Sequence, residues 1–180
     1  SNTQLSLSGG SETTSFLVSL GRLEQTTVFG QDFRYRTNTV SGNISHRSQN
    51  RKFSFNSSSL FSSLDNNLIN SDITRNAYSL SPNAPALYDA NGNLNWENNT
   101  FTNPVAAYEN SYSNDNLQFM NNMSAEYEAF ENVRIKFNGG FNYQTLEEWS
   151  LRPSTAFNPS TGATSLNSQS SKSNMNRFSM

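Results

Sequence analysis

Few residues of this chain have the type and spacing that catalysis requires. His46 is the only histidine and there is no cysteine, so a histidine-based triad or a thiolate metal site would need partners outside the chain. Glu147 and Glu148 form a carboxylate pair, but neighbouring residues on a strand point to opposite faces, which does not suit joint acid–base work. We therefore expect no catalytic residue, no metal site, no cofactor and no enzymatic activity.

The segment 89–93, with the sequence Asp-Ala-Asn-Gly-Asn, contains some of the residues of a calcium loop. An EF-hand loop places Gly at its sixth position and Glu at its twelfth, whereas Gly92 is fourth and Glu97 is ninth. The Asn91-Gly92 pair lies between two short apolar stretches, as in a β-hairpin. We predict a small hairpin that turns at this pair.

Aromatic residues are the best candidates for ligand binding. Five of them lie in a segment that otherwise consists mainly of Asn, Ser, Asp and Pro: Tyr88, Trp96, Phe101, Tyr108 and Tyr112. Aromatic faces beside amide side chains suit sugar rings, which offer apolar C–H faces and many hydroxyls. The same rings would also serve to pack a small core of the loop or to contact a partner protein. We predict ligand or partner contact for these five residues, with the loop core as the alternative.

The composition restricts the kind of protein that carries these residues. Of 180 residues, 33% are hydrophobic, 14% are charged and 12% are aromatic. A soluble domain with so few apolar residues has difficulty burying a core, and a disordered chain usually has more charge and fewer aromatics. The net charge of -2 argues against nucleic acid as a partner. The sequence contains neither an apolar run of helical membrane length nor a signal peptide.

Alternating apolar and polar residues predict an all-β fold. The alternation is clearest in Val133–Tyr143, where the odd positions are apolar or glycine and the even positions are glycine, polar or charged. A strand of about 11 residues is long enough to cross the apolar part of a bilayer. The predicted strands are Thr3–Ser8, Thr14–Leu23, Phe33–His46, Phe53–Leu64, Leu117–Phe130, Val133–Tyr143 and an unfinished strand, Asn174–Met180.

Short and long connections alternate along the chain, and outer-membrane barrels alternate short periplasmic turns with long extracellular loops. The short links are Gly9–Glu12, Gln49–Arg51 and Glu131–Asn132, and the longer ones are Glu24–Asp32, Asp65–Asn116 and Glu148–Ser173. We therefore predict an antiparallel transmembrane β-barrel segment, with residues 65–116 and 148–173 as long extracellular loops. Seven strands cannot close a barrel with a lumen, so we interpret residues 1–180 as part of one larger barrel domain without its plug.

The parity of the last two full strands predicts which face each side chain takes. The lipid-facing set is Phe119, Tyr127, Ile135, Phe137, Phe141 and Tyr143, and the lumen-facing set is Glu126, Glu128, Arg134, Lys136, Asn138 and Asn142. A two-residue turn at Glu131-Asn132 would mix these parities, so we predict a three-residue loop, 131–133. That loop pairs Glu128 with Lys136 and Tyr127 with Phe137, and it gives Asn132 a left-handed backbone.

Several motifs resemble one family, the SusC-like TonB-dependent transporters of the outer membrane. The matching segments, in the order of that family, are Ser8–Phe16, Gly21–Gln25, Asp32–Tyr35, Tyr88–Trp96 and Asn103–Ala106 with Asn110 beyond. The first, Ser-Gly-Gly-Ser-Glu-Thr-Thr-Ser-Phe, is similar to the family's Ser-Gly-Gly-(Asn/Ser)-Glu-(Lys)-Thr-x-(Tyr/Phe) hairpin. The chain departs from the family at Arg22, where Tyr is usual, and at Thr27, where Gly often follows the Gln.

The resemblance implies an importer barrel of about 22 strands in the outer membrane of a Gram-negative cell. It implies uptake of large nutrients, oligosaccharides or peptides, driven through TonB, which would contact the missing N-terminal part. It also implies a SusD-like surface lipoprotein as partner, beside the remaining barrel strands and the membrane lipid. The alternatives are another outer-membrane barrel, such as a siderophore receptor or a porin, and a soluble β-rich surface adhesin or structural protein.

Overall fold

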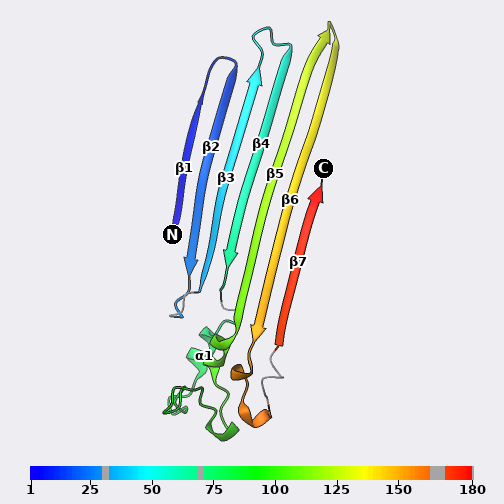
Figure 1. The fold of residues 1–180 in the computed structure, drawn as a ribbon. Helices are drawn as coiled ribbons and strands as arrows, with labels where there is room; N and C mark the ends of the chain where they lie inside the picture. Colours follow the sequence, from blue (N-terminus) through cyan, green and yellow to red (C-terminus); the bar gives the residue numbers. More distant parts are fainter. Residues whose placement is uncertain (30–32, 69–70, 163–168, 180) are drawn as a thin grey trace.

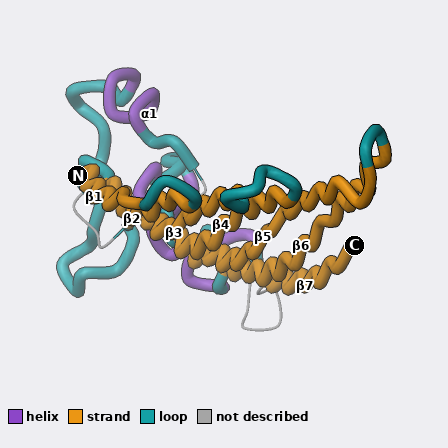
Figure 2. Tube along the Cα trace, turned by 90° about the horizontal axis from the view of Figure 1, so that it is seen from above, coloured by secondary structure: helices purple, strands orange, loops and turns teal. Residues whose placement is uncertain are grey.

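The chain forms one seven-stranded antiparallel sheet whose strands follow each other in chain order (Figure 1). This computed structural model describes residues 1–29, 33–68, 71–162 and 169–179. The strands are β1 (Asn2–Gly10), β2 (Thr14–Thr26), β3 (Arg34–Arg47), β4 (Phe53–Asn66), β5 (Ser111–Phe130), β6 (Val133–Arg152) and β7 (Gln169–Ser179). The sheet is open, with β1 and β7 at its two sides (Figure 2). The predicted all-β antiparallel fold is thereby confirmed, whereas closure into a barrel is not part of this structure.

The three short connections lie at one end of the sheet, and the three longer ones lie at the other (Figure 1). The long ones carry the helical elements: α1 (Thr74–Ser79), η1 (Glu97–Asn99), η2 (Pro104–Glu109), η3 (Ser154–Ala156) and η4 (Pro159–Thr161). We call the described residues 71–110 and 153–162 the loop module. The predicted alternation of short and long connections is confirmed.

Several predicted boundaries are wrong because the strands are longer than the alternation indicates. Gly9 and Gly10 belong to β1 and not to the turn, and β5 begins at Ser111 instead of Leu117. The connections therefore run over 67–110 and 153–168 instead of 65–116 and 148–173. Parts of the predicted loops, residues 30–32, 69–70 and 163–168, lie outside the described residues, as does Met180. At the missed start of β5, every residue from Ser111 to Asn116 except Tyr112 is polar, so the sequence shows no alternation there.

The predicted register between β5 and β6 is also wrong. Glu128 pairs with Arg134 and not with Lys136, because Phe130 pairs with Val133 across a two-residue turn. A bulge between Glu128 and Phe130 leaves Ala129 without a partner and restores the parity that a plain two-residue turn would break. Asn132 does adopt the predicted left-handed backbone, with a φ of 64°.

No hydrophobic core lies under the sheet. Among the described residues, the hydrophobic side chains that are buried are Ile73 and Ala156, both in the loop module, and the buried polar one is Asn103. The sheet is held instead by its backbone ladders and by contacts between neighbouring side chains on each face. No helix in the described part of the chain is both long and apolar enough to cross a membrane.

Candidate functional site

One face of the sheet carries a row of apolar side chains that crosses all seven strands. Successive cross-strand partners form this row, which consists of Leu5, Leu20, Val40, Phe61, Phe119, Tyr143 and Phe178. We call the side of the sheet that bears the row the apolar face and the other side the polar face. Six of the seven side chains are exposed, Leu5 by 67% and Phe178 by 58%. Such a continuous exposed apolar surface marks contact with a partner or with lipid.

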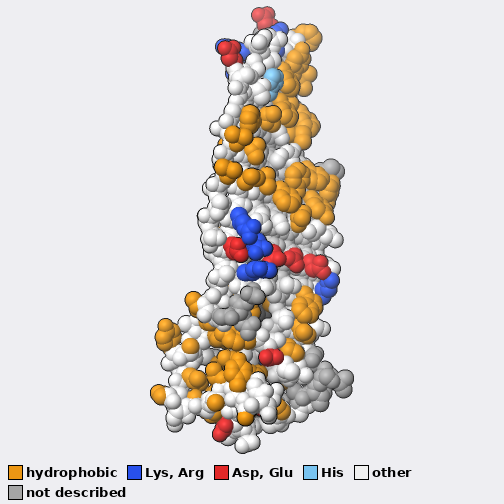
Figure 3. All heavy atoms as spheres, turned by 60° about the vertical axis from the view of Figure 1, so that its left-hand side comes forward, with side chains coloured by type: hydrophobic (Ala, Val, Ile, Leu, Met, Phe, Trp, Pro, Cys, Tyr) orange, Lys and Arg blue, Asp and Glu red, His pale blue; other side chains and the backbone are white. Residues whose placement is uncertain are grey.

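The apolar face is bounded on the side of the loop module by charged residues. Five of them are successive cross-strand partners, each four positions from the apolar-row residue of its strand in the direction of the loop module: Glu24, Arg36, Asp65, Asp115 and Glu147. Glu24 accepts from Arg22 at 3.1 Å and from Arg36 at 3.2 Å, and Lys172 lies 2.6 Å from Glu147. Figure 3 shows these charges as a belt between the hydrophobic surface and the loop module. We call this set, with Arg22 and Lys172, the charged belt.

On each central strand, the apolar surface extends from the apolar row toward the short turns over nine residues: 53–61, 119–127 and 135–143. We call this surface the apolar band. At the belt end of this band, Phe141 lies 5.8 Å from Phe119 and 5.0 Å from Phe178, measured between ring centroids. One polar patch interrupts the band. There, the Asn121 amide donates to the hydroxyls of Ser57 (3.0 Å) and Ser59 (2.7 Å), so these groups satisfy one another.

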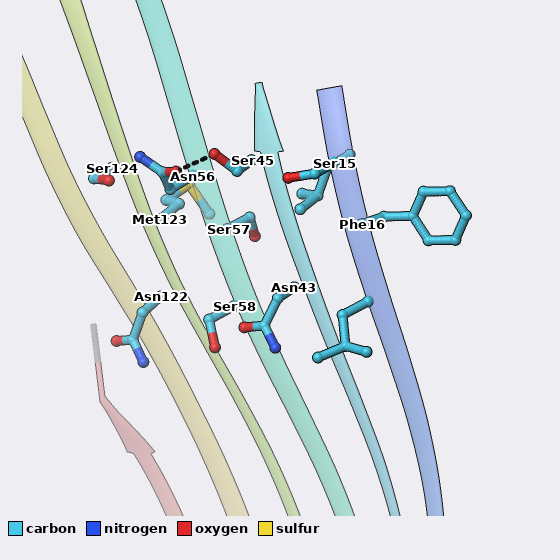
Figure 4. A pocket seen from close by; sticks show the side chains of 12 residues that line it. Ser15, Phe16, Asn43, Ser45, Asn56, Ser57, Ser58, Asn122, Met123 and Ser124 are labelled. Atoms are coloured by element: carbon cyan, nitrogen blue, oxygen red, sulfur yellow. Dashed lines mark hydrogen bonds between the residues drawn. The ribbon is translucent and has the colours of Figure 1, made fainter. Parts of the chain in front are cut away.

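The polar face is lined mainly by serine and asparagine. A shallow depression of about 400 Å³ lies across β2 to β5, and Figure 4 shows Ser15, Asn43, Ser58 and Asn122 around it, with Phe16 pointing away. Within it, the Ser45 hydroxyl donates to the Asn56 amide oxygen at 2.8 Å. The lining of this depression offers many hydroxyl and amide groups and, among the described residues, no charged side chain, which suits contact with water.

The loop module contains the other candidate site, a cleft of about 360 Å³ between two connections that are distant in sequence. We call it the loop cleft. It is lined by Tyr88, Gly92, Asn93, Leu94, Trp96, Glu109, Ser154, Thr155, Phe157 and Pro159. Two hydrogen bonds join its walls: Thr155 Oγ1 donates to Glu109 Oε2 at 3.0 Å, and Asn158 Nδ2 donates to Asn99 Oδ1 at 2.6 Å.

A β-hairpin forms one wall of the loop cleft and confirms the predicted turn at Asn91-Gly92. Tyr88 and Leu94 pair as an antiparallel bridge, and Gly92 has a φ of 83°. The Asp89 carboxylate accepts the backbone N–H groups of Asn91 (2.8 Å) and Asn93 (2.9 Å). Donation from the Asn93 backbone lowers the pKa of Asp89 most, with smaller help from the Asn93 side chain and the Asn91 and Gly92 backbones.

Asn103 fixes this hairpin to η2. It is 2% exposed, and its amide nitrogen donates to the carbonyl oxygens of Leu87 and Asn95, one on each arm of the hairpin. Its amide oxygen caps η2 by accepting the backbone N–H of Val105 at 3.1 Å. The Asn103 side chain therefore links the hairpin and η2 within the loop module.

The five predicted site residues do not share one place. Tyr88 and Trp96 line the loop cleft, while Phe101 is half-buried and lies outside the cleft lining. The ring of Tyr108 packs at 5.9 Å from that of Phe33, and burial raises the pKa of its phenol. Tyr108 thus fits the alternative role of packing the loop. Tyr112 lies in β5, outside the loop module.

The second wall of the cleft, formed by residues of the connection between β6 and β7, was not predicted from the sequence. Phe157, Thr155 and Glu109 were not among the candidates, although the alternation of the connections places both long ones at the same end of the sheet. Arg152 lies 4.1 Å from the centroid of the Phe157 ring, a cation–π contact that holds this wall. Aromatic residues in both long loops were the signal available.

The described residues hold no group of three or more acidic or histidine side chains that could bind a metal ion. Comparison with known proteins gives no family: no protein-family model matches the chain, and no curated protein matches it. The features that bear on function are consequently the sequence motifs, the two faces of the sheet and the loop cleft.

Proposed function

We propose that this chain forms part of the wall and the extracellular mouth of a SusC-like importer barrel in the outer membrane. The observation that carries the proposal is the apolar row from Leu5 to Phe178, exposed on one face of a single sheet. A soluble sandwich would cover such a face with a second sheet. A barrel wall instead turns it toward lipid and keeps the polar face for a water-filled lumen.

The height of the apolar band and the position of the charged belt support this placement. Nine residues are about the length that a tilted strand needs to cross the hydrocarbon layer. The charged belt would then lie at the outer headgroup level, with the aromatic rings of Phe119, Phe141 and Phe178 just inside it. The Asn121 patch is compatible with lipid because its polar groups have partners.

The loop module supports the assignment to an importer instead of a plain wall. Its two connections meet in a cleft with aromatic walls. The segment Tyr88–Trp96, which resembles the transporter family, lines that cleft, and Asn103 of the second resembling segment, Asn103–Ala106, is hydrogen-bonded to it. In this proposal, the module contacts an oligosaccharide or peptide nutrient and a SusD-like lipoprotein lid. TonB would energise uptake through the plug of the complete protein. A siderophore receptor or a porin would share the wall but not this ordered set of motifs.

Site-specific labelling tests the placement directly, because the chain has no native cysteine. We would introduce Ala90→Cys in the hairpin and Asn50→Cys in a short turn, both exposed positions. On intact cells, a membrane-impermeant maleimide should label Ala90→Cys, whereas Asn50→Cys should react only after the outer membrane is permeabilised. Labelling of both on intact cells, or of Asn50→Cys alone, would contradict the proposed topology.

Uptake measurements test the importer role separately from the topology. The double variant Tyr88→Ala with Trp96→Ala removes two aromatic walls of the loop cleft and should reduce nutrient uptake or lipoprotein binding. Tyr78→Ala is the matched control, because this tyrosine is 88% exposed in α1 and lies outside the cleft lining. Unchanged uptake and partner binding in the double variant would reduce the module to a passive connection.

A further inference from the structure

The lining of the loop cleft combines three aromatic rings with a single charged group. Tyr88, Trp96 and Phe157 supply the rings, Glu109 supplies a carboxylate, and no lysine or arginine lines the cleft. An aromatic face attracts a cation through its quadrupole, and a nearby carboxylate adds direct charge attraction. An anionic ligand would meet repulsion from the same groups.

Glu109 is held in position by the opposite wall. Its Oε2 accepts the Thr155 hydroxyl at 3.0 Å, which links the connection between β4 and β5 to the one between β6 and β7. The bond uses one carboxylate oxygen, and no donor among the described residues is hydrogen-bonded to Oε1. A ligand ammonium group has three N–H donors and matches such an acceptor.

The surrounding charge favours the same sign of ligand. Within residues 71–110 and 153–162, the acidic residues are Asp72, Asp89, Glu97 and Glu109, and the basic residue is Arg75. An excess of one sign around a cleft concentrates ligands of the opposite sign near it. Arg152, which lies in β6, already contacts the Phe157 ring, so the rings that we consider for a ligand cation are those of Tyr88 and Trp96, on the side of the cleft away from this guanidinium's partner ring.

We infer that the loop cleft recognises a primary ammonium group carried on a small apolar or ring-shaped body. This inference rests on the proposed function and specifies which nutrients its mouth selects. The group would lie against Trp96 and Tyr88, with Glu109 as its charged partner. An aminated sugar and a lysine side chain of a peptide both present this chemistry.

Calorimetric titration of the protein purified in detergent tests the inference. The ligands are the glucosamine disaccharide and Nα-acetyl-lysine amide, each compared with its form in which every remaining amine is acetylated. At least one amine should bind five-fold or more tightly than its acetylated form, and the tighter of the two identifies the source. Equal affinity of the charged and acetylated forms, or no binding by any of them, overturns the inference.

Two variants assign the preference to Glu109. Glu109→Gln removes the charge but keeps an oxygen that accepts from Thr155, so it should abolish the preference without opening the cleft. Glu97→Gln removes a neighbouring exposed charge outside the lining and should keep most of the preference. A preference that persists in Glu109→Gln overturns the inference. The labelling of Ala90→Cys on intact cells is independent of these titrations, so failure of the ligand assignment and failure of the importer placement are distinguishable.

Discussion

Glu126 lies directly opposite Lys136 in the ladder between β5 and β6, and the Lys136 Nζ forms an ion pair with Glu126 Oε2 at 3.2 Å. Arg134 approaches the other oxygen of the same carboxylate at 3.7 Å. Glu128, which we predicted to pair with Lys136, pairs instead with Arg134 in the backbone ladder. The Glu126 carboxylate therefore contacts two cationic side chains near the turn between β5 and β6.

The exchange of these charges tests the register. Glu126→Lys or Lys136→Glu alone should destabilise the hairpin by roughly 0.5–1 kcal/mol, because each places like charges opposite each other on a largely exposed surface. The double exchange should recover part of that loss. Denaturant unfolding of the four proteins gives the coupling energy, and the same cycle between Glu128 and Lys136 is the control. A larger coupling in the control cycle would support the register that the structure rejects.

Replacement of glycine by alanine should have opposite effects on the free energy of unfolding at two positions of the sheet. A Cβ at Gly10 would lie 2.3 Å from the Thr14 carbonyl oxygen, whereas a Cβ at Gly42 meets nothing within 4 Å. Gly10→Ala should therefore cost about 1–3 kcal/mol through forced displacement of the adjoining turn. Gly42→Ala should be neutral or stabilising by up to about 1 kcal/mol, since it restricts the unfolded chain. Unfolding free energies check both values, and equal effects would show that the β1–β2 turn is wrongly placed.

Asn103→Ala should loosen the loop module more than any other asparagine-to-alanine change there. It leaves the Asn95 carbonyl oxygen and the Val105 N–H without the Asn103 side chain, and it removes one of two donors from the Leu87 carbonyl oxygen, which keeps the Asn95 N–H at 3.0 Å; the cost should be about 1–3 kcal/mol. Amide hydrogen exchange at Asn93 and Asn95 should become faster, while exchange in the central strands stays the same. Asn76→Ala, an exposed position in α1, is the control and should leave both rates unchanged.

The hairpin of the loop cleft should loosen in acid through Asp89. Because donation from the backbone N–H of Asn93 lowers the pKa of this carboxyl in the folded state, its stabilisation is present above the ordinary aspartate pKa. The stabilisation is lost as the pH falls through the lowered folded-state value. The protection factor for hydrogen exchange at Asn93, followed over acidic pH, should show this loss, and Asp89→Asn should remove the pH dependence of that protection factor. A pH response that persists in Asp89→Asn would assign the effect to another carboxyl.

The sheet was largely predictable from its sequence because a period of two is a local signal. Val133–Tyr143 shows it directly, and the shared parity of Tyr127 and Ile135 places both on the apolar face as expected. The bulge at Ala129 was not predictable, since nothing in that residue's type marks it. The strand ends failed for another reason: around Tyr112 and Trp149, the ladder continues because a partner strand is available, without alternation in the sequence.

The loop cleft was only half predictable. Tyr88 and Trp96 belong to a hairpin with a local turn signal, so their neighbourhood could be inferred from the sequence. Phe157 and Thr155 reach the cleft through tertiary packing between separate connections, for which no sequence spacing gives a rule. Tyr108 packs near Phe33, as in the alternative that the sequence left open, because an aromatic residue in a polar segment serves equally well to bind a ligand or to pack the segment itself.

The open side of β1 acts as a template that constrains any strand added beside it. The two-residue period of a strand fixes which residues of an adjoining strand lie next to Leu5 and Leu7, both about two-thirds exposed. A neighbour shifted by one residue would set polar groups beside these leucines and apolar groups on the opposite side. In hydrocarbon, an unpaired backbone amide costs several kcal/mol, so the adjoining strand must be hydrogen-bonded before this edge meets lipid. Assembly of the wall would thus proceed strand by strand, with each edge selecting the next strand by its pattern of apolar residues.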